Sequence, residues 1–190
     1  MTKKDITAPL LPATPADRRT LSLASVSFFD SYYCGMRYAP HREEWFNRFE
    51  TTWNTARDAG DKGRLLVLAP RDHGKTEAAI TFTVRAICLN RDVRILWICE
   101  SAAQAEKRMR RVKHLLRSPR IREDWAEGAG LPSFEGEESP WTNTQVYVPR
   151  PTHSVDPTLS SIGCGGAITG AHYDLVLSDD LESDLSCHTH

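Results

Sequence analysis

The chain has 190 residues, of which 40% are hydrophobic and 26% are charged, and its formal net charge is −1. This composition fits one α/β core, and it gives the whole chain no net attraction for nucleic acid, so a DNA contact would need a local basic patch or a ring of subunits. The longest apolar runs are too short to cross a bilayer, and the N-terminus lacks the apolar segment of a secretory signal. We therefore expect a cytoplasmic protein with no membrane partner.

Residues 1–16 contain three prolines and predict a flexible N-terminal arm, followed by one domain over 17–190. A helix is expected from Asp17 to about Cys34, and a second from about His41 to Ala59, because apolar and aromatic residues recur there at helical spacing before a glycine. Aromatic residues at this spacing usually indicate a packed core.

Residues 64–76, RLLVLAPRDHGKT, carry the clearest functional signal. A run of apolar β-formers predicts a strand over 64–69, and a helix is expected from Lys75 to about Leu89. The residues between follow the spacing G-x-x-x-x-G-K-[ST], with alanine in place of the first glycine: Ala69, Pro70, Arg71, Asp72, His73, Gly74, Lys75 and Thr76. An ordinary strand, turn and helix with a chance GKT is the alternative.

The chemistry of each position explains why this pattern predicts a loop that binds ATP and Mg²⁺. Gly74 lets the backbone approach a phosphate at the N-terminus of a helix, where free amides and the helix dipole favour negative charge. Lys75 would reach the β- and γ-phosphates, and the Thr76 hydroxyl would coordinate Mg²⁺. The chain contains no N-K-x-D guanine-reading sequence, which favours ATP over GTP.

A strand over VRILWIC and a helix from about Ser101 to Arg117 follow the loop. One stripe of this helix is apolar, and six basic residues surround it. The stripe comprises Ala102, Ala105, Met109, Val112 and Leu116, and the basic residues are Lys107, Arg108, Arg110, Arg111, Lys113 and Arg117. A solvated surface is the simplest interpretation of the basic face. Contact with DNA phosphates, or an arginine supplied to the ATP of a neighbouring subunit, are the alternatives.

The last predicted elements bring acids to the site. Residues 123–140 are expected to form a connecting loop, and TQVYVP and PTLSSIG two short strands. YDLVLSDDLE then predicts a short buried strand from Tyr173 to Ser178, with acids where it ends. We assign Asp179 to the Mg²⁺ shell and Asp180 to polarising the attacking water, with Glu182 as a second candidate. A solvated acidic turn is the alternative.

The five cysteines occur without any C-x-x-C pair, so neither a zinc site nor a disulfide framework is expected. They are Cys34, Cys88, Cys99, Cys164 and Cys187. The terminal cluster of Cys187, His188 and His190 has no second pair of ligands nearby in the sequence. We interpret the cysteines as packing residues.

Three segments in this order, APRDHGKT, RILWICESAAQAEKRMRRVKHLL and GCGGAITGAHYDLVLSDDLE, resemble the ATPase domain of large terminase subunits, the motors that pump DNA into tailed-bacteriophage heads. The resemblance covers most of the chain. It implies an α/β P-loop NTPase fold of the RecA-like, additional-strand class, with a mostly parallel central sheet flanked by helices. It also implies Mg²⁺-dependent ATP hydrolysis that drives double-stranded DNA into a procapsid in the host cytoplasm. The implied partners are a portal protein, a small terminase subunit and further copies in a homo-oligomeric ring.

The same resemblance implies roles for individual residues. Arg71 would respond to the γ-phosphate, Asp179 would bind Mg²⁺, and Asp180 stands where the family usually has a catalytic glutamate, which leaves Glu182 in contention. The family has a G-x-TG-x-H-x-D stretch, to which we assign a conformational role, and it is matched here by Gly166, Thr169, Gly170, His172 and Asp174. The family also has a segment that contacts adenine, and it is matched by Tyr38, Pro40 and His41. For the segment of Tyr38, Pro40 and His41, plain packing is favoured over a contact with adenine. For His172, a role as general base is the alternative.

A complete terminase continues through further strands into a nuclease domain, so the resemblance implies that residues 17–190 are an ATPase domain truncated at its C-terminus. We therefore expect nucleotide binding with weak or absent turnover from this chain alone. Two other functions remain open. One is a helicase-like or repair DNA-dependent ATPase, and the other is a truncated, non-catalytic nucleotide-binding remnant.

Overall fold

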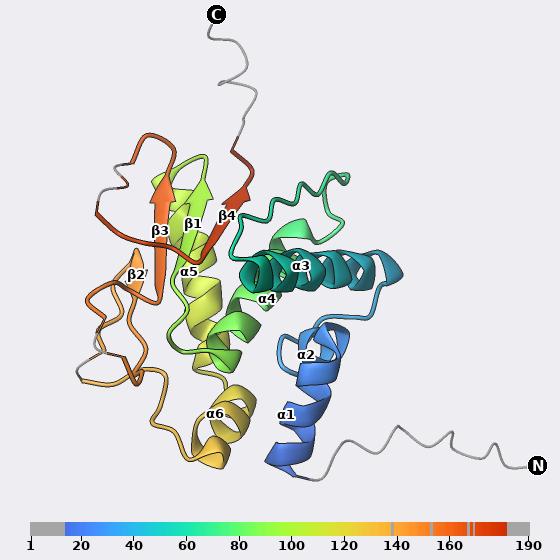
Figure 1. Cartoon of the computed structure of the whole chain (residues 1–190), viewed down its shortest axis with the longest axis vertical. Coiled ribbons are helices and arrows are strands. Elements are labelled where there is room, and N and C mark those ends of the chain that lie inside the picture. Colours follow the sequence, from blue (N-terminus) through green and yellow to red (C-terminus); the bar gives the residue numbers. More distant parts are fainter. Residues whose placement is uncertain (1–13, 138, 153, 167, 169, 182–190) are drawn as a thin grey trace, which may run out of the picture.

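The computed structural model describes residues 14–181 except 138, 153, 167 and 169 (Figure 1). Its helices are α1 Pro15–Ala24, α2 Val26–Tyr32, α3 Pro40–Ala59, α4 Lys75–Leu89, α5 Ala102–Leu116 and α6 Pro119–Trp125, with a short 3-10 helix, η1, at Glu127–Ala129. The strands are β1 Ile95–Cys99, β2 Gln145–Val146, β3 Leu159–Gly163 and β4 Leu175–Asp179.

The strands form a four-stranded mixed sheet in the order β2-β3-β1-β4. The central strand β1 runs parallel to both β3 and β4, and the short β2 is antiparallel to β3. Because β1, β3 and β4 are parallel, their carboxyl ends lie at one edge of the sheet, where Cys99 of β1 is level with Asp179 of β4. An α/β fold with a mostly parallel sheet flanked by helices is thus confirmed.

Helices α1, α2 and α3 lie on the right of Figure 1, beyond β4, and α6 lies below the sheet. Helix α5 packs against β1 and β3, and α4 packs between α5 and the helices α2 and α3. The main core includes Phe29 of α2, Trp97 of β1, Met109 of α5 and Trp125 of α6, all nearly or fully buried. This core fixes the start of α4 relative to the carboxyl ends of the strands.

The helix expected over 17–34 is in fact two helices, α1 and α2, divided at Ser25. Ser25 has extended backbone angles, and its hydroxyl accepts a hydrogen bond from the amide of Phe28 at 3.1 Å, so it caps the start of α2. Helix α3 ends as expected before Gly60, which takes the left-handed conformation, and α4 has the expected bounds. Of the expected arm over 1–16, residues 1–13 lie outside the described residues, and Pro15 already begins α1.

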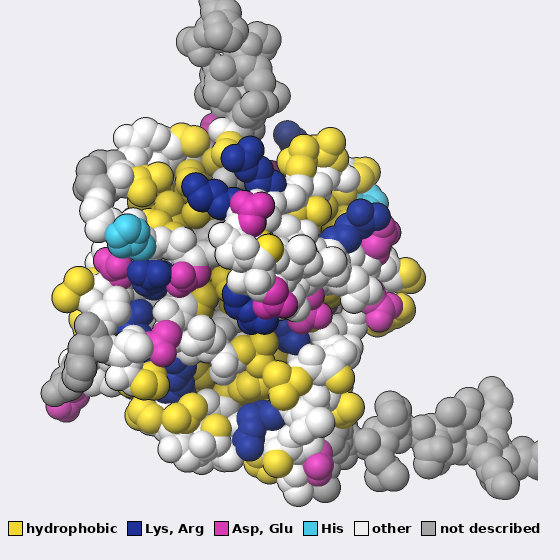
Figure 2. Space-filling view, viewed as in Figure 1, with side chains coloured by type: hydrophobic (Ala, Val, Ile, Leu, Met, Phe, Trp, Pro, Cys, Tyr) yellow, Lys and Arg dark blue, Asp and Glu magenta, His cyan; other side chains and the backbone are white. Residues whose placement is uncertain are grey.

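The strand expected over 64–69 is wrong, because this segment has no regular structure and lies outside the sheet. Leu66 and Leu68 are 78% and 84% exposed, and hydrophobic side chains gather over the loop between α3 and α4 at the upper right of Figure 2. The start of the segment, Arg64 and Leu65, faces the outer edge of β4 across a groove of about 1160 Å³. A strand needs a hydrogen-bonded neighbour, and this groove separates Arg64 and Leu65 from the free edge of β4.

In the expected additional-strand class, the strand over VRILWIC would lie between the loop strand and the acidic strand. Strand β1 pairs with the inner edge of β4, whereas residues 63–65 face its outer edge (Figure 1). The additional strand therefore does not lie between the two motif-bearing segments in space. Strand β4 is an edge strand, only half buried, with Val176 53% exposed, and not the buried strand expected.

Lysine at positions 66 and 68 is expected to leave the fold almost unchanged. Because both leucine side chains already lie in solvent, the variants Leu66→Lys and Leu68→Lys should each change the free energy of unfolding by less than about 0.5 kcal/mol. Urea denaturation followed by circular dichroism measures this change. Leu116→Lys on the fully buried face of α5 is the contrasting variant and should unfold the domain. A loss of more than 2 kcal/mol for Leu66→Lys would mean that residues 64–69 pack as a buried strand.

Three of the cysteines are packing residues, as expected. Cys34, Cys88 and Cys99 are buried, whereas Cys164 is exposed and Cys187 lies outside the described residues, as do His188 and His190. Burial raises the pKa of Cys34 to about 12. Within the described part of the chain, no helix is both long and apolar enough for a membrane span.

Candidate functional site

The loop over 69–76 ends at Gly74, which is the N-cap of α4 and has a φ of 80°. Two features require glycine here. The positive φ is unfavourable for other residues, and a Cβ on Gly74 would lie 2.7 Å from a terminal nitrogen of Arg42. Asp72 also has a positive φ, of 63°. The first amides of α4 have no acceptor within the helix, so the loop and the helix start form a surface with donors for an anion.

Arg42 holds this loop against the rest of the fold. Its Nη1 donates to the carbonyl of Gly74 at 2.9 Å, and its Nη2 and Nε donate to the carboxylate of Asp30 at 2.6 and 3.1 Å. The hydroxyl of Thr81 donates to the same carboxylate at 2.6 Å. Arg42 and Asp30 are both nearly fully buried. Sequence reasoning missed this contact, because an arginine at the start of a helix usually indicates a solvated side chain.

The other loop side chains lie at the surface or fold back onto the loop. The Lys75 ammonium donates to the carbonyl of Ala69, so the amine lies within the loop that it would serve. Arg71, Asp72 and His73 are exposed. A ring nitrogen of His41 lies 3.1 Å from the carbonyl oxygen of His73. Tyr38 is 61% exposed and donates to Glu43, so it does not pack as expected.

The two motif-bearing segments meet at Thr76 and Asp179. The Thr76 hydroxyl lies 3.1 and 3.0 Å from the two carboxylate oxygens of Asp179, although these residues are 103 positions apart. Thr76 is in the first turn of α4, and Asp179 is the last residue of β4. The core of α4, α5 and β1 therefore brings together the two residues that sequence reasoning assigned to the metal.

A guanidinium contacts the same carboxylate. Arg108 of α5 donates from Nε to Oδ2 of Asp179 at 2.9 Å, and its Nη2 lies 3.8 Å from Oδ2 of Asp180. The side chain of Arg108 is 15% exposed and that of Asp179 is 10% exposed. The sequence placed Arg108 on a basic helix face but gave no signal that it reaches Asp179 and Asp180.

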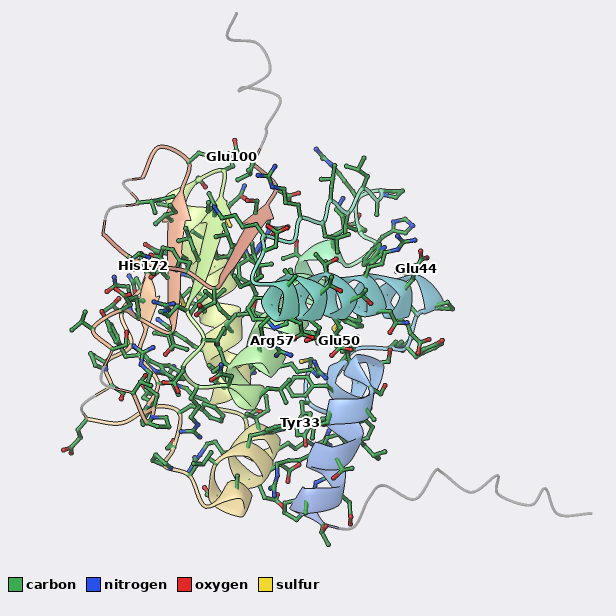
Figure 3. All side chains as sticks on the ribbon, viewed as in Figure 1. Tyr33, Glu44, Glu50, Arg57, Glu100 and His172 are labelled. Atoms are coloured by element: carbon green, nitrogen blue, oxygen red, sulfur yellow. The ribbon has the colours of Figure 1, made fainter. Side chains whose placement is uncertain are left out.

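The remaining acids differ in position. Asp180 has a positive φ of 49° and its side chain is 58% exposed, whereas Glu182 lies outside the described residues. Glu100 follows β1 at the same end of the sheet (Figure 3) and accepts a hydrogen bond from the Gln104 side chain at 3.1 Å. Sequence reasoning did not single out Glu100, because it lies in neither motif.

The stretch before β4 lies away from this site. Asp174 precedes β4 and forms an ion pair with Arg94, at 2.9 Å, at the opposite end of the strand from Asp179. His172 is exposed and lies on the β3 side of the molecule, far from α3 (Figure 3). Gly170 has a positive φ, as has Gly165, and Thr169 lies outside the described residues.

The expected basic face of α5 is largely paired. Arg108 binds Asp179, Arg111 lies 3.4 Å from Glu77, and Arg117 lies 2.6 Å from Glu135. Lys113 is buried rather than exposed and donates to the carbonyl of Thr142. Burial lowers the pKa of its ammonium. Ala102, expected on the apolar stripe, is exposed. Most of these basic residues are therefore either paired with an acid or buried.

The donor set at Thr76 and Asp179 fits a magnesium ion held with nucleotide. No group of three or more histidine, cysteine or acidic side chains suited to a metal occurs among the residues described here. Mg²⁺ bound with a nucleotide needs only one or two protein oxygens, because phosphate oxygens and waters complete its octahedron. A hydroxyl and a carboxylate are hard oxygen ligands of the required type.

Neither the known family models nor the curated proteins contain a match to this chain. The functional assignment therefore depends on the loop sequence, on the resemblance described above and on the geometry at Thr76, Asp179 and Arg108.

Proposed function

We propose that this chain carries an ATPase domain of the P-loop class, in which Mg²⁺-dependent ATP hydrolysis is performed between the start of α4 and the end of β4. The contact between the Thr76 hydroxyl and the Asp179 carboxylate, at 3.0 and 3.1 Å, is the single observation that carries the proposal. P-loop enzymes hold Mg²⁺ with the Ser or Thr of the loop and an Asp at the end of a neighbouring strand.

The loop amides, the N-terminus of α4 and Lys75 would hold the phosphates, and Thr76 and Asp179 would hold the ion. Mg²⁺, when bound, neutralises charge on the β- and γ-phosphates. Asp180 is the described acid best placed to orient the attacking water, because it follows Asp179 directly and its side chain reaches solvent. Arg71 would approach the γ-phosphate, since its side chain is exposed in the turn that precedes Gly74.

The task that we propose for this ATPase is translocation of double-stranded DNA as part of a terminase large subunit. This step has the support of the three resembling segments alone. A portal protein, a small terminase subunit and a homo-oligomeric ring belong to the same proposal. Lys107, an exposed basic residue on α5, would contact a phosphate backbone or a neighbouring subunit.

Nucleotide binding without turnover is the second candidate, and the position of residues 64–69 favours it. Phosphoryl transfer depends almost entirely on positioning. A loop whose leading segment lies outside the sheet has fewer fixed contacts than a loop that follows a paired strand. Arg42 and its bond to the Gly74 carbonyl then hold the loop in place of strand pairing.

Isothermal titration calorimetry with MgATP tests the proposal. Lys75→Ala should lower the affinity about 10- to 100-fold, the equivalent of one charged hydrogen bond to phosphate at about 1.5–3 kcal/mol. Lys62→Ala is the matched control, because Lys62 is exposed outside the loop, and it should bind as the unchanged protein does. Equal affinities for all three proteins would contradict the assigned site.

Phosphate release separates the two candidates. A hydrolysis rate that Lys75→Ala removes supports the ATPase, whereas binding that depends on Lys75, with equal phosphate release from both proteins, supports binding without turnover.

A further inference from the structure

The guanidinium of Arg108 contacts the carboxylate of Asp179, which would have to be free to bind a metal ion. Its Nε is 2.9 Å from Oδ2 of Asp179, and Thr76 Oγ1 is 3.0 Å from that same oxygen. Mg²⁺ binds its oxygens at about 2.0–2.1 Å in an octahedron. An ion coordinated by Thr76 and Asp179 would therefore lie within a few ångströms of the guanidinium, where two cations repel each other strongly in a partly buried site.

The position of Arg108 on α5 explains why it reaches Asp179. Ala105, Met109 and Val112 are buried under the sheet, so position 108 lies at the border of the packed face and its side chain is 15% exposed. Arg110, two residues away, is 69% exposed and its nearest acid is Glu106 at 3.8 Å. The helix thus presents one arginine to the acids and another to solvent.

We propose that Arg108 is an internal counter-cation for Asp179, which holds the carboxylate while no metal is bound and must leave it when a divalent ion binds. This inference rests on the proposed function for the identity of the ion. The guanidinium and a metal ion exclude each other at Oδ2 of Asp179, and the guanidinium also neutralises the carboxylate charge that would attract the ion, so the free protein has a low affinity for the ion alone. The phosphates of a nucleotide raise that affinity, because they bring negative charge to the site and offer oxygen acceptors to a guanidinium that has left Asp179.

The first experiment measures binding of Mn²⁺ alone, by electron paramagnetic resonance, to nucleotide-free protein. Arg108→Gln is expected to bind Mn²⁺ about tenfold more tightly than the unchanged protein, because an adjacent positive charge is lost at a partly buried site. Arg110→Gln removes the same charge from the same helix and should stay within about twofold, since an exposed charge is screened. Equal affinities for Arg108→Gln and Arg110→Gln would overturn the proposal.

The gain must also depend on Asp179. The double variant Arg108→Gln with Asp179→Asn should lose the tenfold gain, and a retained gain would place the extra ion elsewhere and overturn the proposal. If ATP binding proves independent of Lys75 while the gain remains, the proposed function fails and the counter-cation role stands. If ATP binding depends on Lys75 and the gain is absent, the counter-cation role fails alone.

A second measurement uses the unchanged protein and does not depend on the folding of a variant. The Nε–H of Arg108 should give a slowly exchanging nitrogen-15 resonance while it donates to Asp179. Addition of Mg²⁺ to saturation, without nucleotide, should speed its exchange with water at least tenfold, because the ion takes the carboxylate and no phosphate is present to accept a hydrogen bond from the guanidinium. A resonance that stays protected at saturation would mean that Arg108 keeps Asp179 in the loaded state, and it would overturn the proposal.

Discussion

Asp124→Asn is expected to lower the free energy of unfolding by about 3–5 kcal/mol, because it removes the buried negative charge that faces the guanidinium of Arg18. Asp124 of α6 is fully buried and accepts hydrogen bonds from Nε and Nη2 of Arg18 at 2.8 and 2.6 Å. It also accepts one from the hydroxyl of Tyr33 at 2.6 Å. Urea denaturation measures the loss.

The packing around Asp124 explains the size of this effect. Burial, with the hydrogen bond to Asp124, raises the pKa of Tyr33 well above its usual range, and Figure 3 places Tyr33 between α2 and α6. Asp124 therefore joins α1, α2 and α6 through one carboxylate. An asparagine amide can accept at one oxygen only, so at least one of the three hydrogen bonds to the carboxylate is lost.

Glu123→Gln is the matched control, since Glu123 contacts the same guanidinium at 2.9 Å but is 61% exposed. A solvent-exposed pair contributes about 0–1 kcal/mol, so Glu123→Gln should stay within that range. Losses of similar size for the two variants would mean that Asp124 is accessible to water.

Local sequence signals predicted the elements whose ends are set by residues within them. Helix α4 has the predicted bounds Lys75–Leu89 because the loop glycine sets its start, and α3 ends before Gly60, which takes the left-handed conformation. The meeting of Thr76 with Asp179 follows from two motifs. Each helix end and each of the two motifs depends on a few consecutive residues.

The predictions that were wrong, and the contacts that were missed, depend on partners far away in the chain. Residues 64–69 have the composition of a strand, but strand pairing depends on what lies beside them. A groove lies between the start of this segment and β4. The pair of Arg108 and Asp179 spans 71 positions. An arginine on an amphipathic helix has the same local pattern whether it meets solvent or an acid, so the sequence could not select Arg108 among its neighbours.

Arg42→Met is expected to weaken both the fold and nucleotide binding. Arg42 is bonded to a buried carboxylate, Asp30, and to the Gly74 carbonyl. Its removal leaves Asp30 buried without a cation, which should lower the free energy of unfolding by about 3–5 kcal/mol. It also releases the loop, and the loss of one charged hydrogen bond should lower the affinity for MgATP about tenfold. Arg48→Met, on the exposed face of the same helix, should change the free energy of unfolding by about 0.5 kcal/mol or less and leave the affinity for MgATP unchanged.

A double variant separates the two effects of Arg42. Asp30→Leu combined with Arg42→Met removes both buried charges, so it should recover much of the stability, since an apolar pair can replace a buried ion pair at little cost. It cannot restore the bond to the Gly74 carbonyl, and the MgATP affinity should therefore stay low. Stability and affinity that recover together would show that Arg42 acts on the loop only through global stability. Affinity that stays low in a stable protein would identify Arg42 as the residue that positions the phosphate loop in the absence of a paired strand before it.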